Sequence, residues 1–87
     1  MFHQRLRHVR MIRRYTQQSV ADYLGLSLNA YQKYEQAERS PSLDCLLKIC
    51  DLFQIPSDYL LGRDSYLESL GVSVDALLED PQDHPKS

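Results

Sequence analysis

Residues 16–36 constrain the fold more than any other part of the chain, because they contain two helix starts and one helix end in a short span. Thr16 and Ser27 are good N-cap residues, and Gly25 suits the left-handed position that ends a helix. Apolar residues follow helical spacing in both segments: Val20, Ala21 and Leu24 in the first, and Ala30, Tyr31 and Tyr34 in the second. The sequence therefore predicts two short helices joined by a turn of three or four residues.

Three more helices are predicted around this pair. An i, i+4, i+7 spacing that starts at Phe2 predicts a first helix over residues 2–13. Ser40 and Pro41 look like an N-cap and a first helical position, and they open a fourth helix. Its inward residues are expected to be Leu43, Leu46, Leu47, Cys50 and Phe53. With a short fifth helix in residues 57–62, the prediction is an all-α, compact five-helix domain over residues 1–63, followed by a short helical extension.

Several classes of protein are excluded by composition and spacing. No apolar run approaches the roughly 18 residues that a membrane span needs, so we expect a cytoplasmic protein without a membrane partner. No nucleophile, base and orienting group occur together, and three glycines leave little for a phosphate-binding loop, so we expect no enzyme and no cofactor. Cys45 and Cys50 lie about 140° apart around a helix, which disfavours a mutual disulfide or a shared metal site.

The charge is distributed unevenly along the chain. Residues 1–40 carry seven Lys and Arg against three acidic residues, whereas residues 41–87 carry three against nine. The total of -2 therefore hides a basic half and an acidic half. Such a chain can present one face to a polyanion while the other face repels it, although a solvated charged surface gives the same composition.

The predicted third helix carries a row of residues outside its inward apolar face, and this stripe has no obvious structural purpose. It lies on the side opposite Ala30, Tyr31 and Tyr34. Its members are Leu28, Asn29, Gln32, Lys33 and Gln36. A merely solvated face would favour Glu and Lys pairs. Asn and Gln side chains can instead pair with adenine, Lys can reach guanine, and an apolar side chain can touch a thymine methyl group.

The segment TQQSVADYLGLSLNAYQKYEQAERSPSLDCLLKICDLFQIPSDYLLG resembles the lambda-repressor-like helix-turn-helix domain of Cro/cI-type (XRE-type) regulators. Their pattern runs T-Q-x-x-[LV]-A, G-[LV]-S, an inner aromatic residue before Glu, P-S-L and D-x-L-L-G. The resemblance covers about residues 2–63. Two positions depart from it, since the family has glycine where this chain has Arg14 and Ala37. Neither residue favours the left-handed conformation that glycine adopts at a helix end.

The resemblance implies a sequence-specific regulator of transcription that binds double-stranded DNA, most simply a repressor. Base reading is implied for Leu28, Asn29, Gln32 and Lys33, and contacts to the DNA backbone for Gln17, Arg10, Gln36 and Arg39. Arg10 and Glu35 match a pair of residues that forms an internal ion pair in some members. Tyr31 and Tyr34 are expected in the core. The alternative is an antitoxin-like or regulator-binding interaction module on the same fold, whose partner is a toxin or another regulator.

The rest of the chain is predicted to join two copies. Members of this fold class bind DNA as two-fold dimers, and residues 64–80 contain more apolar side chains than so small a protein leaves in water. They either fold back on their own domain or bury against a partner, and we expect a homodimer. The predicted dimerisation residues are Leu60, Leu61, Tyr66, Leu67, Leu70, Val72 and Leu77, with Val74 and Leu78 in the same segment. Residues 81–87 are expected to form a flexible tail.

Overall fold

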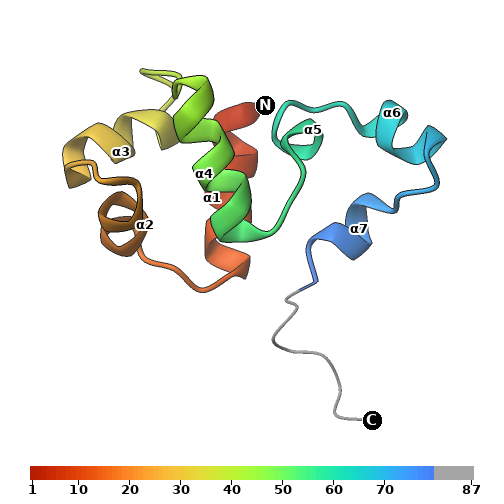
Figure 1. The fold of residues 1–87 in the computed structure, drawn as a ribbon, viewed down its shortest axis with the longest axis horizontal. Coiled ribbons are helices and arrows are strands. Elements are labelled where there is room, and N and C mark those ends of the chain that lie inside the picture. Colours follow the sequence, from red (N-terminus) through yellow and green to blue (C-terminus); the bar gives the residue numbers. More distant parts are fainter. Residues whose placement is uncertain (80–87) are drawn as a thin grey trace, which may run out of the picture.

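The computed structural model describes residues 1–79, which form helices without any strand (Figure 1). The described helices are α1 (Phe2–Ile12), α2 (Gln17–Leu24), α3 (Leu28–Glu35), α4 (Leu43–Phe53), α5 (Ser57–Leu60), α6 (Asp64–Ser69) and α7 (Val74–Leu77). The all-α prediction is confirmed. The predicted tail at 81–87 lies outside the described residues. None of the described helices is long and apolar enough to cross a membrane.

Side-chain caps fix the helix pair α2 and α3 where the sequence predicts it. The Thr16 side chain accepts a hydrogen bond from the Ser19 amide at the start of α2. Ser27 does the same for the Ala30 amide at the start of α3. Gly25 ends α2 in the left-handed region with φ 71°, so only residues 25–27 separate the two helices.

The core is built from the first five helices, from Ile55 in the loop between α4 and α5, and from one residue of α6. Leu6 and Val9 of α1, Tyr31 of α3 and Phe53 of α4 are fully buried. The other buried apolar residues are Val20, Ala21, Leu24, Tyr34, Ile49, Ile55, Tyr59, Leu60 and Leu67. This core holds α3 against both α1 and α2, so the reading helix predicted from sequence has a rigid support.

The start of α4 differs from the prediction. Ser42, not Ser40, is the N-cap, and its hydroxyl accepts from the Cys45 amide. Because Ser40 and Ser42 both fit the cap pattern, sequence alone could not separate them, and Pro41 lies before the helix rather than in it. The structure therefore adds residues 41 and 42 to the loop.

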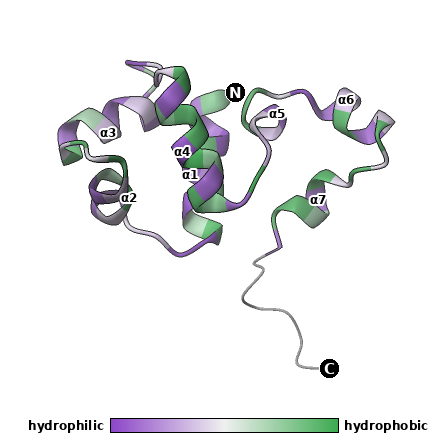
Figure 2. Ribbon diagram, in the orientation of Figure 1, coloured by the Kyte–Doolittle hydropathy of each residue, from purple (hydrophilic) through white to green (hydrophobic). Residues whose placement is uncertain are grey.

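The inward face of α4 also differs from the prediction. Leu43 and Leu47 are 78% and 61% exposed, whereas Ile49 and Phe53 are buried. Figure 2 shows hydrophobic residues recurring along α4, with hydrophilic residues between them. The apolar arc is wider than the strip that the core covers, so the predicted face was wrong by part of a turn.

The two departures from the family pattern have a clear structural result. Arg14 and Ala37 adopt φ values of 66° and 62°, the left-handed region that favours glycine. These residues flank the unit formed by α2 and α3. The chain therefore adopts the left-handed conformation without glycine and accepts backbone strain at both borders of that unit.

The extension folds back on its own domain. Leu67 of α6 is only 4% exposed and joins the core. At the start of α6, Arg5 holds Asp64 through two hydrogen bonds of 2.5 and 2.7 Å. At the end of α7, Arg13 donates to the carbonyl oxygens of Leu77 and Leu78 at 2.9 and 3.0 Å. Arg5 of α1 and Arg13, which directly follows α1, therefore anchor both ends of the extension.

Candidate nucleic-acid interface

The predicted reading stripe lies on the side of α3 that faces away from the core. Asn29 and Gln36 are exposed, and Leu28, Gln32 and Lys33 are half-buried. On the other side of the helix, Tyr31, Tyr34 and Glu35 are buried, and the two tyrosine rings meet edge to face. The stripe is thus held in place from behind by packed side chains.

A buried carboxylate organises the residues next to the stripe. The expected ion pair is present: Arg10 donates through Nε and Nη2 to Glu35 at 2.6 and 3.2 Å. The Tyr31 hydroxyl and the Gln17 amide also donate to Glu35, the latter at 3.1 Å. Arg10 further donates to the Tyr15 carbonyl oxygen at 2.9 Å. One carboxylate therefore connects α1, α2 and α3.

The electrostatics of this cluster keep Glu35 ionised. Burial alone raises the pKa of the Glu35 carboxyl, but the hydrogen bonds that it accepts, above all from Arg10, bring that pKa below its ordinary value of 4.5. The hydrogen bond to Glu35 raises the pKa of the Arg10 guanidinium. Burial and Glu35 together raise the pKa of the Tyr31 hydroxyl, which remains a donor at neutral pH.

The ionised carboxylate sets the direction of the next hydrogen bonds. A carboxylate without a proton only accepts, so Gln17 must turn its NH2 group toward Glu35. The Gln17 carbonyl oxygen then faces Gln32 and accepts from its Nε2 at 3.1 Å. The orientation of the Gln32 amide therefore follows from the buried charge of Glu35, to which it is linked through Gln17 by two hydrogen bonds.

The remaining predicted backbone contacts lie outside this network. Gln36 and Arg39 are exposed on the segment that leaves α3, next to the strained Ala37. Glu38 is exposed in the same segment. The structure therefore groups Arg10, Gln17 and Gln32 with Glu35, and it leaves Gln36 and Arg39 free of that group.

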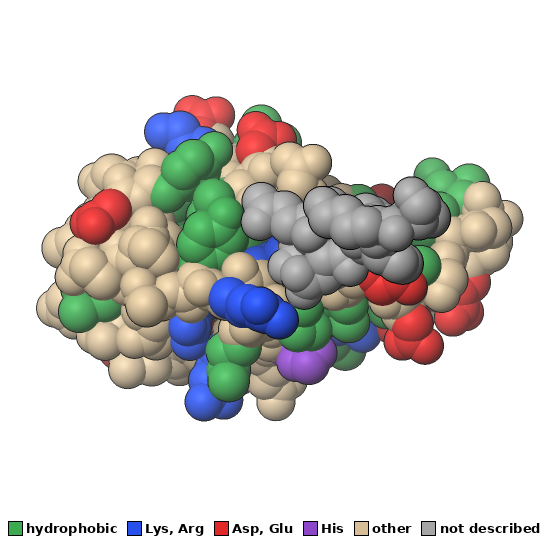
Figure 3. All heavy atoms as spheres, turned by 90° about the horizontal axis from the view of Figure 1, so that it is seen from below, with side chains coloured by type: hydrophobic (Ala, Val, Ile, Leu, Met, Phe, Trp, Pro, Cys, Tyr) green, Lys and Arg blue, Asp and Glu red, His purple; other side chains and the backbone are tan. Residues whose placement is uncertain are grey.

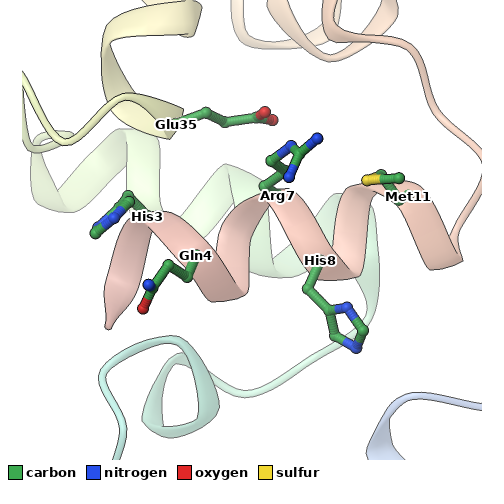
Figure 4. Close-up of a pocket in the computed structure, with 6 residues that line it drawn as sticks. All are labelled: His3, Gln4, Arg7, His8, Met11 and Glu35. Carbon is green, nitrogen blue, oxygen red and sulfur yellow. The ribbon is translucent and has the colours of Figure 1, made fainter.

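Sequence reasoning missed a hollow along α1 next to Glu35. It has a volume of about 320 Å³. Its lining residues are His3, Gln4, Arg7, His8, Met11 and Glu35. In Figure 4, His3 and Arg7 lie on the side of α1 that faces Glu35, and His8 points away. The signal was present as polar residues at helical spacing, since His3 and Arg7 lie four positions apart, as do Gln4 and His8.

Acidic side chains lie at the opposite end of the molecule. In Figure 3 a group of Asp and Glu side chains gathers where α6 and α7 form the end of the molecule. Two basic residues of the first half also lie against this end, since Arg5 pairs with Asp64 and Arg13 donates to the carbonyl oxygens of Leu77 and Leu78. Among the described residues, no group of three His, Cys, Asp or Glu side chains is arranged to hold a metal ion.

A scan of protein families matches residues 6–60 to the model described as helix-turn-helix. The chain belongs to the helix-turn-helix family. The matched residues contain the whole of α2, α3 and their turn. The resemblance to Cro/cI-type regulators is thereby confirmed.

Several relatives carry informative names. The chain is 34% identical over 83 residues to the SPbeta prophage-derived uncharacterized HTH-type transcriptional regulator YonR of Bacillus subtilis, covering 94% of this chain and 72% of the relative. It is 40% identical over 60 residues to the HTH-type transcriptional regulator ImmR of Bacillus subtilis, covering 69% of this chain and 47% of the relative.

A third relative is a phage protein. The cryptic phage CTXphi transcriptional repressor RstR of Vibrio cholerae is 46% identical over 48 residues, covering 55% of this chain and 43% of the relative. The chain thus spans about half the length of two of these three relatives. No solved structure gives a significant match.

The predicted dimerisation residues fall into three groups. Leu60 and Leu67 are buried within the protomer, at 0% and 4% exposure, and cannot meet a partner in this conformation. Val72 and Leu77 are half-buried and pack against the core. Leu61, Tyr66 and Leu70 are exposed. Because the extension packs on its own domain, it leaves only part of the predicted interface accessible.

Proposed function

We propose that this protein is a sequence-specific transcriptional regulator, acting as a repressor in the cytoplasm by occupying double-stranded DNA. The observation that carries the proposal is the chain of hydrogen bonds from Glu35 through Gln17 to Gln32, which holds two amides beside the exposed face of α3. A solvated surface gains nothing from such orientation, whereas a base-reading surface depends on it. The helix-turn-helix match and the relatives named as regulators and repressors support the proposal.

Base reading is proposed for four residues of α3. Gln32 donates one amide hydrogen to Gln17, which leaves its second hydrogen and its carbonyl oxygen for an adenine edge. Asn29 is exposed and has the same chemistry. Lys33 suits guanine, and Leu28 suits a thymine methyl group. The face as a whole therefore favours a mixed site with adenine near its centre.

Backbone contacts are proposed for Gln17, Gln36 and Arg39. Gln17 opens α2, where free backbone amides and the helix dipole favour a phosphate. Arg10 contributes less than the sequence suggests, because three of its donor hydrogens already bind Glu35 and Tyr15. Its main role is to compensate the Glu35 charge, with the rest of its guanidinium edge left for a phosphate.

The interaction-module alternative is disfavoured by the comparisons, which return regulators of transcription. Salt separates the two functions directly. Binding to DNA phosphates should weaken steeply between about 50 and 200 mM salt, because neutralised phosphates release counterions. Docking of a toxin or another regulator on an apolar surface should change little over the same range.

The decisive experiment is selection from a random double-stranded DNA library. Wild type should enrich one site, and Asn29→Ala and Lys33→Ala should each change that site at one or two positions, costing about 1–3 kcal/mol there. Gln36→Ala serves as the control, and it should weaken all sequences alike. The reading face is assigned wrongly if wild type and both α3 variants return the same site.

We further propose that the protein binds its operator as a homodimer. One domain covers few base pairs, and a two-fold dimer places two reading helices in major grooves about 34 Å apart. The operator should then contain two inverted half-sites with that spacing.

A further inference from the structure

Arg7 is the arginine of α1 whose side chain the fold leaves unused. Arg5 binds Asp64 of α6, and Arg10 binds Glu35 of α3. Arg7 is exposed, and its side chain forms no ion pair or hydrogen bond with the part of the chain that the structure describes. An arginine is always charged at neutral pH. Helix α1 therefore presents one uncompensated cation to solvent.

This cation lies in the hollow of about 320 Å³ along α1, called the α1 hollow below. His3 and Arg7 stand on the side of α1 that faces Glu35 (Figure 4). Glu35 is the acidic residue of the lining, but its side chain is only 2% exposed and Arg10 compensates its charge. Met11, which is 55% exposed, adds an apolar surface. The α1 hollow is therefore positively charged, and it has room for a phosphate group and part of a sugar.

The α1 hollow adjoins the proposed backbone site at the start of α2. Gln17, the residue proposed for that site, donates at 3.1 Å to the Glu35 carboxylate, and Glu35 also lines the hollow. Arg7 and Gln17 are therefore neighbours of the same buried side chain. Both α1 and α2 pack against α3, the helix proposed to read the bases. A strand of DNA that passes the start of α2 would thus also be within reach of α1.

We propose that the α1 hollow binds a phosphate of the DNA backbone, next to the phosphate that Gln17 approaches. Arg7 provides the charge and a pair of parallel N–H donors, the geometry that suits a phosphate. His3 adds a ring N–H donor, and Met11 contacts the adjoining deoxyribose, a group that a free phosphate ion lacks. The inference rests on the proposed function, and it adds Arg7 and its hollow to the surface that holds the DNA backbone.

The first test measures the affinity of the full chain for its selected operator as salt rises. Lys48→Ala is the matched control, because Lys48 is an exposed cation on α4 that does not line the α1 hollow. Arg7→Ala should weaken binding about fivefold at about 50 mM salt and reduce the slope of log affinity against log salt by about 1, the value for one phosphate. Lys48→Ala should leave the slope unchanged. Equal slopes for wild type and Arg7→Ala overturn the proposal.

Two further measurements on Arg7→Ala separate a phosphate contact from other roles. Since Arg7 has no side-chain partner among the described residues, the variant should keep the Tm of wild type. Phosphate contacts carry no sequence information, so the variant should also select the same site from a random DNA library. A changed site would mean that Arg7 reads bases, and the assignment to a phosphate would be wrong.

The second test locates the phosphate. Single phosphates of the operator are replaced in turn by uncharged methylphosphonates, and each duplex is titrated with wild type, Arg7→Ala and Gln17→Ala. At one or two positions the replacement should weaken wild type but not Arg7→Ala, because that variant has already lost the contact. The positions that become silent in Gln17→Ala should be different and adjacent. If every replacement weakens Arg7→Ala as much as wild type, Arg7 binds no phosphate.

The third test asks whether the α1 hollow takes a free anion instead. Calorimetric titration of wild type with pyrophosphate should show no saturable binding. Pyrophosphate binding that Arg7→Ala abolishes, together with equal operator slopes, would assign the hollow to a free anion and overturn the proposal. If wild type selects no DNA site at all, the proposed function fails and this inference fails with it. If wild type selects a site and Arg7→Ala binds it with the wild-type slope, the inference alone fails.

Discussion

Glu35 is the residue on which the order of the proposed reading surface depends. Its side chain is 2% exposed. It accepts hydrogen bonds from Arg10 of α1, Gln17 of α2 and Tyr31 of α3. The bond between Gln17 and Gln32 continues this network toward solvent. A single buried charge therefore combines a structural role, joining three helices, with a positional role at the proposed interface.

Removing that charge should destabilise the protein. Glu35→Gln keeps the shape but leaves Arg10 uncompensated, and we expect a loss of about 3 kcal/mol, the low end for breaking a buried pair, because Arg10 is partly exposed. Arg10→Met combined with Glu35→Gln should cost less than the two single losses added together. Urea unfolding of the four proteins measures the coupling. Additive losses would show that the pair contributes no coupling energy.

The same carboxylate gives stability a pH dependence. Because the folded pKa of Glu35 lies below its ordinary value of 4.5, its contribution is complete above that value and is lost as pH falls through the folded pKa. We expect the free energy of unfolding to decrease below about pH 4.5. Glu35→Gln should show a shallower decrease over this acid range. Equal slopes for the two proteins would assign the acid loss to other carboxyls.

Ala37 offers a stabilising substitution. A non-glycine residue in the left-handed region costs about 1–2 kcal/mol, and glycine costs about 0.5–1 kcal/mol in the unfolded chain. Ala37→Gly should therefore stabilise the protein by about 0.5–1 kcal/mol and raise Tm by a few degrees. Ala30→Gly, placed inside α3 with helical geometry, should lower Tm instead. A lower Tm for Ala37→Gly would mean that φ 62° carries no strain.

At the scale of elements, capping residues predicted the helix pair α2 and α3, but sequence did not predict which face of a helix packs against the core. Thr16 and Ser27 cap amides only three residues away, and Gly25 ends α2 by its own conformation. The bounds of α2 and α3 could therefore be predicted from these residues alone. Leu43 and Leu47 were misplaced because a wide apolar arc does not reveal which part the core covers.

The contacts that sequence could not predict join distant residues. Arg13 binds the end of α7, which lies more than sixty positions later in the sequence. The hydrogen bond between Gln17 and Gln32 joins α2 to α3. Neither contact has a local pattern, because each depends on how whole helices pack. For the site, the stripe on α3 and the Arg10–Glu35 pair were predictable, whereas the direction of the amides and the hollow on α1 were not.

Arg13 should control how firmly α7 is held. Its guanidinium donates to four carbonyl oxygens, one on Phe53 and three at the end of α7. Arg13→Ala should lose about 1.5–3 kcal/mol and speed amide hydrogen exchange in residues 77–79. Arg7→Ala, an exposed change on the preceding helix α1, is the control and should leave that exchange unchanged. Unaltered exchange in Arg13→Ala would mean that α7 is anchored by packing alone.

At the scale of the whole molecule, the folded-back extension makes the protomer a single body with opposite ends. Acidic side chains gather at the end formed by α6 and α7, where Arg5 pairs with Asp64 and Arg13 donates to carbonyl oxygens at the end of α7. We expect DNA phosphates to be repelled by the acidic end, which would orient the protein before any base is contacted.

The extension should also contribute to global stability. Cutting the chain after Arg63 removes Leu67 from the core and Asp64 from Arg5. Burial of Leu67 alone corresponds to about 1.5–3 kcal/mol, so the urea midpoint should fall clearly. The preference for a half-site should persist, because α3 packs against α1 and α2, whereas α6 packs against α5 and α7. An unchanged midpoint would show that α6 adds nothing to the fold.

The network around Glu35 also determines how this protein could acquire a new target. Gln32 is tied to Gln17, so a change there disturbs the support of the surface as well as its chemistry. Asn29 and Lys33 make none of the hydrogen bonds of this network, so substitutions there should alter the preferred bases of the proposed reading face while the fold keeps its stability. Divergence among related operators should therefore proceed through positions 29 and 33 first, with position 32 following only together with position 17.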